Sequence, residues 1–326
     1  MMRIDLIRNV CSRFDVLSVF TEELGSALRA AGIQSTTLDL RFLTLEEFQN
    51  YCREIAPDAF IGFNVFDFKN EYIDKEKYPL LSIVVDAPFH YPEIFEAEEQ
   101  IFAFVDKRYQ KLVGEQGHSK AFFLPHAVSK ESLKGSPKKN RPYDIVMAGS
   151  LFEEPVSKDK DEAFWEVAAR SQDKRSMLSI LSSYPVHIFA TEEEKKICHS
   201  WLPHNAFIFH EPVPYRYLSE VFSKAKIVLN SMPTLQEGLH ERLLLALSKG
   251  ASVVSSPSSY AEQFFKEDSA VSYYRSYDEL EEKVQKILSN EKKRREDVEE
   301  ARKVVLHNHT WERRLERILD ILWPCL

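Results

Sequence analysis

The feature that most constrains the fold is a series of short apolar segments rich in Val, Ile and Phe, which recur about every 20 residues with helical patterns between them. Buried parallel strands have this near-continuous apolar character, and helices connect them. The pattern predicts an α/β protein with doubly wound parallel sheets. The predicted strands of the first half are residues 3–9, 35–40, 58–64, 80–86, 101–106 and 121–126, and those of the second half are 143–150, 186–190, 206–210, 226–230, 251–256 and 270–274.

A break in this pattern divides the chain. Residues 129–144 (SKESLKGSPKKNRPYD) lack an apolar period and are rich in Gly, Ser, Pro and basic residues, as surface linkers are. We therefore expect two tandem Rossmann-like domains, residues 1–140 and 141–309, with a cleft between them. Residues 276–323 show amphipathic helical spacing and predict C-terminal helices on this globular body.

Composition excludes several classes of protein. The net charge of -8 offers no basic surface for nucleic acid, and no apolar run is long enough to cross a bilayer. The four cysteines, Cys11, Cys52, Cys198 and Cys325, have neither disulfide-framework nor zinc-site spacing, and the histidines are too scattered for a metal site. These features favour a cytoplasmic protein without a bound metal.

In parallel sheets ligands bind beyond the carboxyl ends of the strands, so the loops there are informative. After the strand 226–230 comes EGLHER, residues 237–242, followed by a helix that is apolar on every side, about residues 239–249. A buried helix N-terminus suits a phosphate, Arg242 would add positive charge, and Gly238 lets the backbone approach closely. Glu241 could accept hydrogen bonds from sugar hydroxyls. The alternative is an ordinary cap, with Glu241 complementing the helix dipole.

Three other loops carry candidate residues. Gly149 and Ser150 follow the first strand of the second half, where phosphate loops usually lie, although no GxGxxG is present. Tyr215 follows the strand 206–210 and is either an aromatic platform for a base or a packing residue. His126 follows the last strand of the first half and is equally compatible with a binding and a structural role.

The loop DAPFHYPE, residues 86–93, places Asp86, His90 and Glu93 at the end of a central strand of the first half. Asp86 or His90 could act as a base or bind sugar hydroxyls. Alternatively, Asp86 caps the following turn and His90 is a structural histidine.

Several of these segments together resemble GT-B glycosyltransferases, in particular the spore-maturation CgeB-like group. The resemblance is strongest in HEPVPYRYLSEVFSKAKIVLN, EGLHERLLLALSKGASVVSS, SYDELEEKVQKIL and HTWERRLERIL of the second half. PDAFIGFN, IVVDAPFHYPE and LPHAV extend it to the first half, so it covers most of the chain.

The resemblance implies sugar transfer from a nucleotide-diphosphate sugar, by default a UDP-sugar, without an obligatory metal or cofactor. The second domain would hold the donor, the first the acceptor, and residues 310–326 would pack back on the first domain. The recurrent His-Glu-Arg triplet of the group matches His240, Glu241 and Arg242. Related GT-B enzymes carry a Glu, seven residues and a second Glu; Glu237 matches the first, but Leu245 occupies the second position, which questions a retaining mechanism.

These features give a working mechanism and its rivals. Arg242 would neutralise the leaving diphosphate, Glu241 would hold the ribose, His240 or Glu237 the donor sugar, and Gly149 and Ser150 the phosphate. Asp86 or His90 would take the acceptor proton in an inverting reaction. The rivals are a nucleotide-sugar epimerase, a non-catalytic nucleotide- or sugar-binding scaffold, and a DNA-modifying glycosyltransferase, which the acidic charge balance disfavours.

Overall fold

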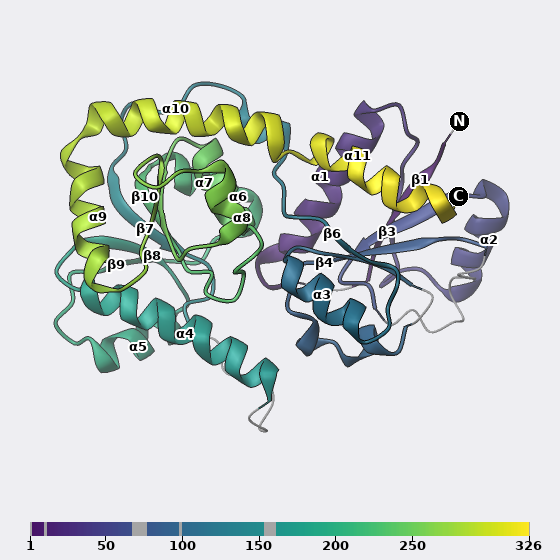
Figure 1. Cartoon of the computed structure of the whole chain (residues 1–326), viewed down its shortest axis with the longest axis horizontal. Helices are drawn as coiled ribbons and strands as arrows, with labels where there is room; N and C mark the ends of the chain where they lie inside the picture. Colours follow the sequence, from purple (N-terminus) through teal and green to yellow (C-terminus); the bar gives the residue numbers. More distant parts are fainter. Residues whose placement is uncertain (1, 10–11, 67–76, 98–99, 153–160, 326) are drawn as a thin grey trace. The chain divides into compact units, whose positions relative to one another are not determined.

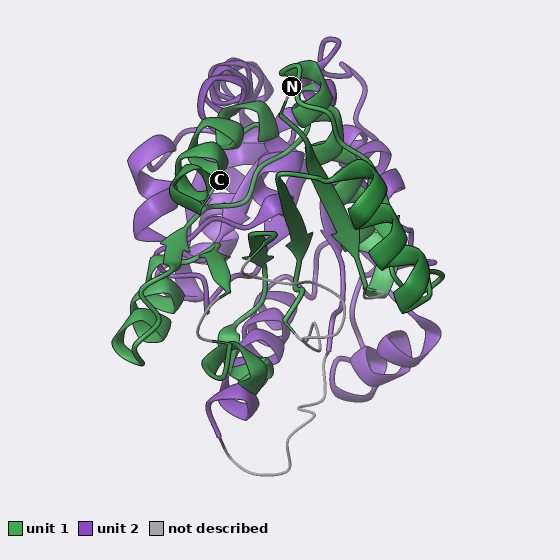
Figure 2. Ribbon diagram, turned by 90° about the vertical axis from the view of Figure 1, so that its right-hand side faces the viewer, with its two compact units in different colours: residues 1–130, 309–326 green, residues 131–308 purple. Residues whose placement is uncertain are grey.

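The computed structural model describes residues 2–9, 12–66, 77–97, 100–152 and 161–325 of the chain. They form two compact units, coloured separately in Figure 2. Unit 1 consists of residues 1–130 and 309–326, and unit 2 of residues 131–308. Within the described ranges, no helix combines the length and apolar character that a membrane span requires.

The sheet of unit 1 has six parallel strands in the order β2-β1-β3-β4-β5-β6. Most residues of its central strands are buried, which is typical of strands with helices on both faces. The chain passes from β1 to β2 on one side and later adds β3 on the other, so the topological switch point lies between β1 and β3. The strands are β1 (Ile4–Arg8), β2 (Thr37–Asp39), β3 (Ala59–Phe63), β4 (Leu80–Val84), β5 (Ile101–Phe104) and β6 (Ala121–Phe123).

Four α-helices surround this sheet, and the last of them, α11 (Trp311–Leu322), comes from the far end of the chain. Val128 pairs with Thr310 in a parallel bridge that leads into α11. The buried indole of Trp311 packs edge-on against Phe63, with ring centroids 5.5 Å apart. The other helices of unit 1 are α1 (Val16–Ala30), α2 (Leu45–Ile55) and α3 (Lys107–Glu115), with 3-10 turns η1 (Arg13–Asp15), η2 (Pro88–His90), η3 (Pro92–Phe95) and η5 (Trp323–Cys325).

The sheet of unit 2 also has six parallel strands, in the order β12-β11-β10-β7-β8-β9. Its switch point lies between the neighbours β10 and β7, where Ile227 pairs with Ile145. The strands are β7 (Tyr143–Ala148), β8 (Val186–Phe189), β9 (Ile208–His210), β10 (Ala225–Asn230), β11 (Ser252–Ser255) and β12 (Val271–Tyr273). All twelve strands that the sequence predicts are present, and the prediction of two Rossmann-like domains is confirmed.

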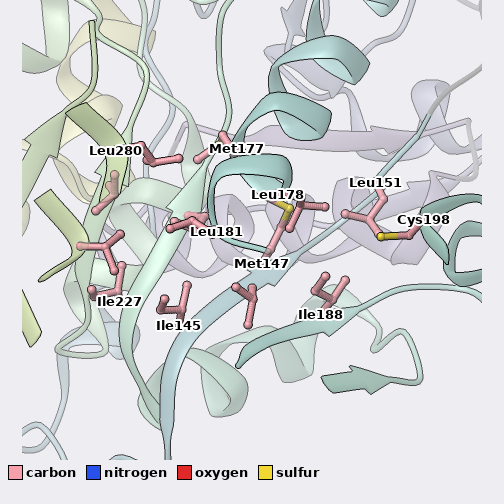
Figure 3. Packing of buried hydrophobic residues seen from close by; sticks show 14 of the residues in the cluster. Ile145, Met147, Leu151, Met177, Leu178, Leu181, Ile188, Cys198, Ile227 and Leu280 are labelled. Carbon is pink, nitrogen blue, oxygen red and sulfur yellow. The ribbon is translucent and has the colours of Figure 1, made fainter. Parts of the chain in front are cut away.

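Helices cover both faces of this sheet (Figure 1). One face forms the core shown in Figure 3, where Met177 of α4 and Leu181 at its C-cap meet Ile145 of β7, Cys198 of α5 and Leu280 of α9. On the other face α7 contacts β10, β11, α6 and α10, which explains why the predicted helix 239–249 is apolar on every side. The helices of unit 2 are α4 (Glu162–Ile180), α5 (Glu192–Trp201), α6 (Tyr215–Ser223), α7 (Glu241–Ser248), α8 (Ser259–Phe264), α9 (Asp278–Ser289) and α10 (Glu291–Asn308), with the 3-10 turn η4 (Lys130–Leu133).

Candidate functional site

The switch point of unit 2 brings two of the predicted loops together. The turn at Gly149 follows β7, and the segment 231–240 follows its neighbour β10 and leads into α7. Arg242, in the first turn of α7, reaches back to the end of β7, where its Nη1 donates a hydrogen bond to the carbonyl oxygen of Ala148 at 2.8 Å. The arginine therefore joins the two sides of the switch point.

Gly149 makes this contact sterically possible. Its φ of +108° lies in the left-handed region, which other L residues rarely adopt. A Cβ atom at this position would lie 2.4 Å from Nη1 of Arg242, far inside van der Waals contact. Both the backbone conformation and the close approach of Arg242 thus require glycine at the end of β7.

His240 lies at the N-cap of α7 and contacts both of its neighbours. Its Nε2 is 2.8 Å from Nη2 of Arg242, and its Nδ1 is 2.9 Å from a carboxylate oxygen of Glu241. A guanidinium can only donate, so the contacts with Arg242 require an accepting ring nitrogen and therefore a neutral His240 ring. Nδ1 of His240 also accepts a hydrogen bond from the backbone N–H of Arg242 at 3.2 Å, which caps the helix.

The surroundings of His240 favour this neutral ring. Burial lowers the pKa of His240, the positive charges of Arg242 and Lys174 lower it further, and Glu241 opposes them. Glu241 is buried in the first turn of α7, and its second carboxylate oxygen is 3.8 Å from Nε of Arg242. The triplet is therefore one connected group at the N-terminus of a buried helix.

The segment 231–240 is anchored at several points around this group. Ser258 donates a hydrogen bond to the carbonyl oxygen of the buried Gly238 at 2.5 Å, and the Met232 N–H donates to Oγ of Ser256 at 2.8 Å. Glu237, beside Gly238, is half-buried. These bonds fix the backbone that precedes α7, although Gly238 itself has no left-handed φ.

Two polar groups at the end of β10 were not among the residues singled out from the sequence. Asn230 and Ser231 are buried, and Oδ1 of Asn230 and Oγ of Ser231 have no hydrogen-bond partner within the part of the chain that the structure describes. Buried polar atoms are usually satisfied, so such a pair at a switch point indicates a place for a polar ligand or water. In the sequence, the feature that could have indicated these residues is the Asn-Ser pair at the end of the apolar strand 226–230.

Helix α4 adds charged residues that sequence reasoning also missed. Nζ of Lys174 donates to the carbonyl oxygen of Ser150 at 2.6 Å, next to Gly149. Glu166, two turns earlier, accepts a hydrogen bond from Oγ1 of Thr234 in the segment 231–240 at 2.9 Å. Both side chains are buried, and their spacing of eight residues on one helix was the available signal.

Tyr215 occupies the first position of α6 in unit 2. Only 7% of its surface is exposed, and the preceding Pro214 occupies the N-cap. This burial is typical of a packing residue, whereas a stacking platform needs an open ring face.

In unit 1, Asp86 lies beyond the end of β4 within a small polar group. Its Oδ2 accepts hydrogen bonds from Nδ2 of Asn64 at 2.7 Å and from the hydroxyl of Tyr91 at 3.1 Å. Asn64 directly follows β3 and has a left-handed φ of +50°, and its Oδ1 accepts the N–H of Val85 at 3.0 Å. His90, at the end of η2, is half-buried with its ring edge-on to Tyr91. Asn64 was not predicted, although it directly follows an apolar strand.

His126 lies beneath the C-terminal helix of unit 1. Its ring packs against Phe20 with centroids 5.6 Å apart, and its carbonyl oxygen accepts a hydrogen bond from Arg314 of α11 at 3.0 Å. Only 4% of its surface is exposed.

Among the predicted residues, the structure thus joins Gly149, Ser150, His240, Glu241 and Arg242 around one switch point, with Glu237 and Gly238 on the adjoining segment, and keeps Asp86 and His90 together in unit 1.

No group of three or more His, Cys, Asp or Glu side chains in the described ranges is arranged to hold a metal ion.

Comparison with known proteins gives a family for part of the chain. Residues 170–320, from the middle of α4 into α11, match the family model described as "Glycosyl transferase-like", which is somewhat under half of the chain. No curated protein matches the sequence.

Solved structures resemble the chain over nearly its whole length. An α-glucosyltransferase in complex with UDP and a 13-mer DNA containing an HMU base has a TM-score of 0.73 at 10% identity, covering 99% of both chains. AviGT4, a glycosyltransferase involved in avilamycin A biosynthesis, has a TM-score of 0.67 at 11% identity, covering 100% of this chain and 98% of its own. Sucrose-phosphate synthase of Thermosynechococcus elongatus has a TM-score of 0.64 at 11% identity with full coverage of both chains. The two-domain GT-B fold that the sequence resemblance implied is confirmed.

Proposed function

We propose that this chain is a hexosyltransferase that binds a nucleotide-diphosphate sugar, by default a UDP-sugar, at the switch point of unit 2 and transfers the sugar to an acceptor held by unit 1. The observation that carries the proposal is the connected group of Gly149, His240, Glu241 and Arg242 at a buried helix N-terminus. The family match in the same unit and the UDP-bound α-glucosyltransferase of the same fold support it.

The donor site would work through positive charge and backbone donors. The N-terminus of α7 carries a partial positive charge, to which Arg242 adds a full charge. This charge would stabilise the departing nucleoside diphosphate, and stabilising charge that develops in the transition state is usually the largest catalytic contribution. We therefore propose transfer that needs no metal.

Individual residues receive roles from their positions. The backbone N–H groups of Gly149 and Ser150 would hold a phosphate, and Glu241 would accept hydrogen bonds from the ribose hydroxyls. His240 or Glu237 would contact the donor sugar. The unsatisfied oxygens of Asn230 and Ser231 lie at the end of the same strand and are suited to a polar ligand.

On the acceptor side, Asp86 would serve as the base of an inverting reaction. The hydrogen bonds from Asn64 and Tyr91 fix the orientation of its carboxylate. His90 is the alternative base, and His126, which is buried under α11, would act at most through its packing. We propose membership of the CgeB-like group on the sequence resemblance alone, and the free thiols of Cys52, Cys198 and Cys325 support a cytoplasmic location.

The second candidate acceptor is DNA, because the α-glucosyltransferase of similar fold was solved with modified DNA. The net charge of -8 opposes this choice. Binding to duplex that weakens steeply with added salt would support it.

The test is nucleotide binding by the purified protein, measured as thermal stabilisation with UDP, GDP, CDP, TDP and their sugar conjugates, with and without magnesium. A ligand at a hundredfold excess over its Kd should stabilise the fold by about 2.7 kcal/mol. Arg242→Ala should abolish the shift. Arg275→Ala is the matched control, since Arg275 is an exposed partner of Glu262 in the same unit.

Product analysis then separates the possible activities. Transfer to an acceptor supports the proposal, interconversion of the donor sugar without acceptor indicates an epimerase, and binding without turnover indicates a scaffold. No shift with any nucleotide, or an undiminished shift in Arg242→Ala, would contradict the donor site.

A further inference from the structure

Helix α4 carries a stripe of charged residues to which the proposed donor chemistry assigns no role. Glu166, Arg170 and Lys174 are spaced by four residues and therefore share one helix face. Charged side chains are rarely fully buried, yet only 9% of Glu166 and 6% of Lys174 is exposed. We call these three residues the α4 stripe.

The stripe contacts both loops of the unit 2 switch point. Lys174 donates to the carbonyl oxygen of Ser150, in the turn after β7. Glu166 accepts from Thr234, in the segment after β10, and its other oxygen is 3.3 Å from Nη2 of Arg170. One rigid helix thus holds the two loops that would surround the phosphates of a donor.

The charge of Lys174 also bears on the His240–Glu241–Arg242 group. Together with burial and Arg242, it lowers the pKa of His240, while Glu241 raises it. Lys174 is therefore close enough to influence the candidate site electrostatically as well as through the Ser150 backbone. A buried ammonium that served packing alone would carry a desolvation penalty that an apolar side chain avoids.

We propose that Lys174 and Glu166 are positioning residues of the donor site, which hold the Gly149–Ser150 turn and the segment 231–240 in register and place a buried positive charge behind the phosphate-binding turn. This inference rests on the proposed donor site in unit 2. It predicts that the α4 stripe strengthens binding of the donor's diphosphate and does not affect binding of its nucleoside.

The test compares the affinities of the full chain for UDP and for uridine by calorimetry. Lys174→Met removes the charge at similar volume and should weaken UDP binding by about tenfold or more, as expected for a hydrogen bond to a charged group, without changing the affinity for uridine. Lys174→Arg restores the charge and should recover part of the UDP affinity. Lys195→Met is the control, because Lys195 is a more exposed lysine paired with Glu192 on α5.

A second variant keeps the inference testable if Lys174→Met folds poorly. Thr234→Val is nearly isosteric and removes only the hydroxyl that donates to Glu166, so UDP binding should weaken by about three- to tenfold.

Three outcomes overturn the inference. Unchanged UDP affinity in folded Lys174→Met and Thr234→Val shows that the stripe does not position the site. Equal loss of UDP and uridine binding shows a general structural role. Failure of the unsubstituted protein to bind any nucleotide overturns the proposed function itself, and because it is measured before any substitution it is distinguishable from the first two.

Discussion

Replacing Gly149 with alanine tests the central contact of the candidate site. The substitution adds one methyl group where the backbone has a φ of +108° and where the new Cβ would lie 2.4 Å from Nη1 of Arg242. Two separate effects follow, strain in the backbone and displacement of the guanidinium from the carbonyl oxygen of Ala148.

The magnitude can be worked out from these two effects. A non-glycine residue held in a sparsely populated backbone region costs about 1–3 kcal/mol. Loss of a hydrogen bond from a charged donor to a buried carbonyl costs about 1.5–3 kcal/mol. Gly149→Ala should therefore lower the free energy of unfolding by roughly 2.5–6 kcal/mol, a large fraction of the roughly 5–15 kcal/mol of a typical domain. Nucleotide binding should be lost with it, since Arg242 moves.

Urea unfolding measures the loss, and two further variants separate its causes. Gly135→Ala is the control for strain alone, because Gly135 has a φ of +78° in the same unit but no atom within 4 Å of the added Cβ. It should cost about 1–2 kcal/mol. In an Arg242→Ala background the clash is absent, so Gly149→Ala should there cost about 1–3 kcal/mol.

Gly149 and Arg242 are therefore interdependent. The coupling between the Gly149 and Arg242 substitutions should be about 1.5–3 kcal/mol, equal to the hydrogen bond that either substitution removes. Additive effects, or a Gly149→Ala cost no larger than that of Gly135→Ala, would refute the claim that Arg242 is held against this glycine.

Two further predictions concern stability. Burial raises the pKa of Glu23 to about 7 from its ordinary 4.5, so the stabilisation by its protonated form is complete below about pH 4.5 and is lost as the pH rises through about 7. Urea unfolding of Glu23→Gln should lack this fall of on the order of 3 kcal/mol, while the exposed neighbour variant Glu22→Gln should keep it; the same fall in Glu23→Gln would disprove the assignment. The buried guanidinium of Arg141 donates to the carbonyl oxygens of Phe222 and Ala225, so Arg141→Lys, which cannot reproduce the fork, should destabilise unit 2 by about 2–4 kcal/mol. Unfolding midpoints equal to those of the unsubstituted protein would show that one donor suffices.

The sheets could be predicted because their strands are buried on both faces. Segments such as residues 226–230 (KIVLN) and 251–256 (ASVVSS) have consecutive apolar residues at their centres and are mostly buried, and a parallel sheet between two helical layers is the arrangement that accommodates such strands. The helix at 239–249 could be predicted from the sequence for a related reason. Its apolar character on all sides corresponds to contacts with the sheet on one side and with α6 and α10 on the others.

The α4 stripe could not be recognised in the same way. Charged residues at helical spacing ordinarily form a solvated surface, whereas Lys174 and Glu166 are buried and bond to Ser150 and Thr234, which lie 24 and 68 residues away in the chain. Asn64 was missed because a single Asn after a strand is common in turns, and its bond to Asp86 depends on the pairing of β3 with β4.

Arg242 shows why the residue types in the site were predictable while their arrangement was not. The sequence indicates a cation at a helix N-terminus, but the structure gives this cation neutral acceptors, the carbonyl oxygen of Ala148 and the neutral ring of His240, with the carboxylate of Glu241 farther away at 3.8 Å. Neutral acceptors fix the orientation of a guanidinium without cancelling its charge, whereas a close carboxylate would cancel most of it. The positive charge of Arg242 therefore remains available to an anionic ligand, and its orientation is fixed in this way only while His240 remains neutral, because an imidazolium could no longer accept from Arg242.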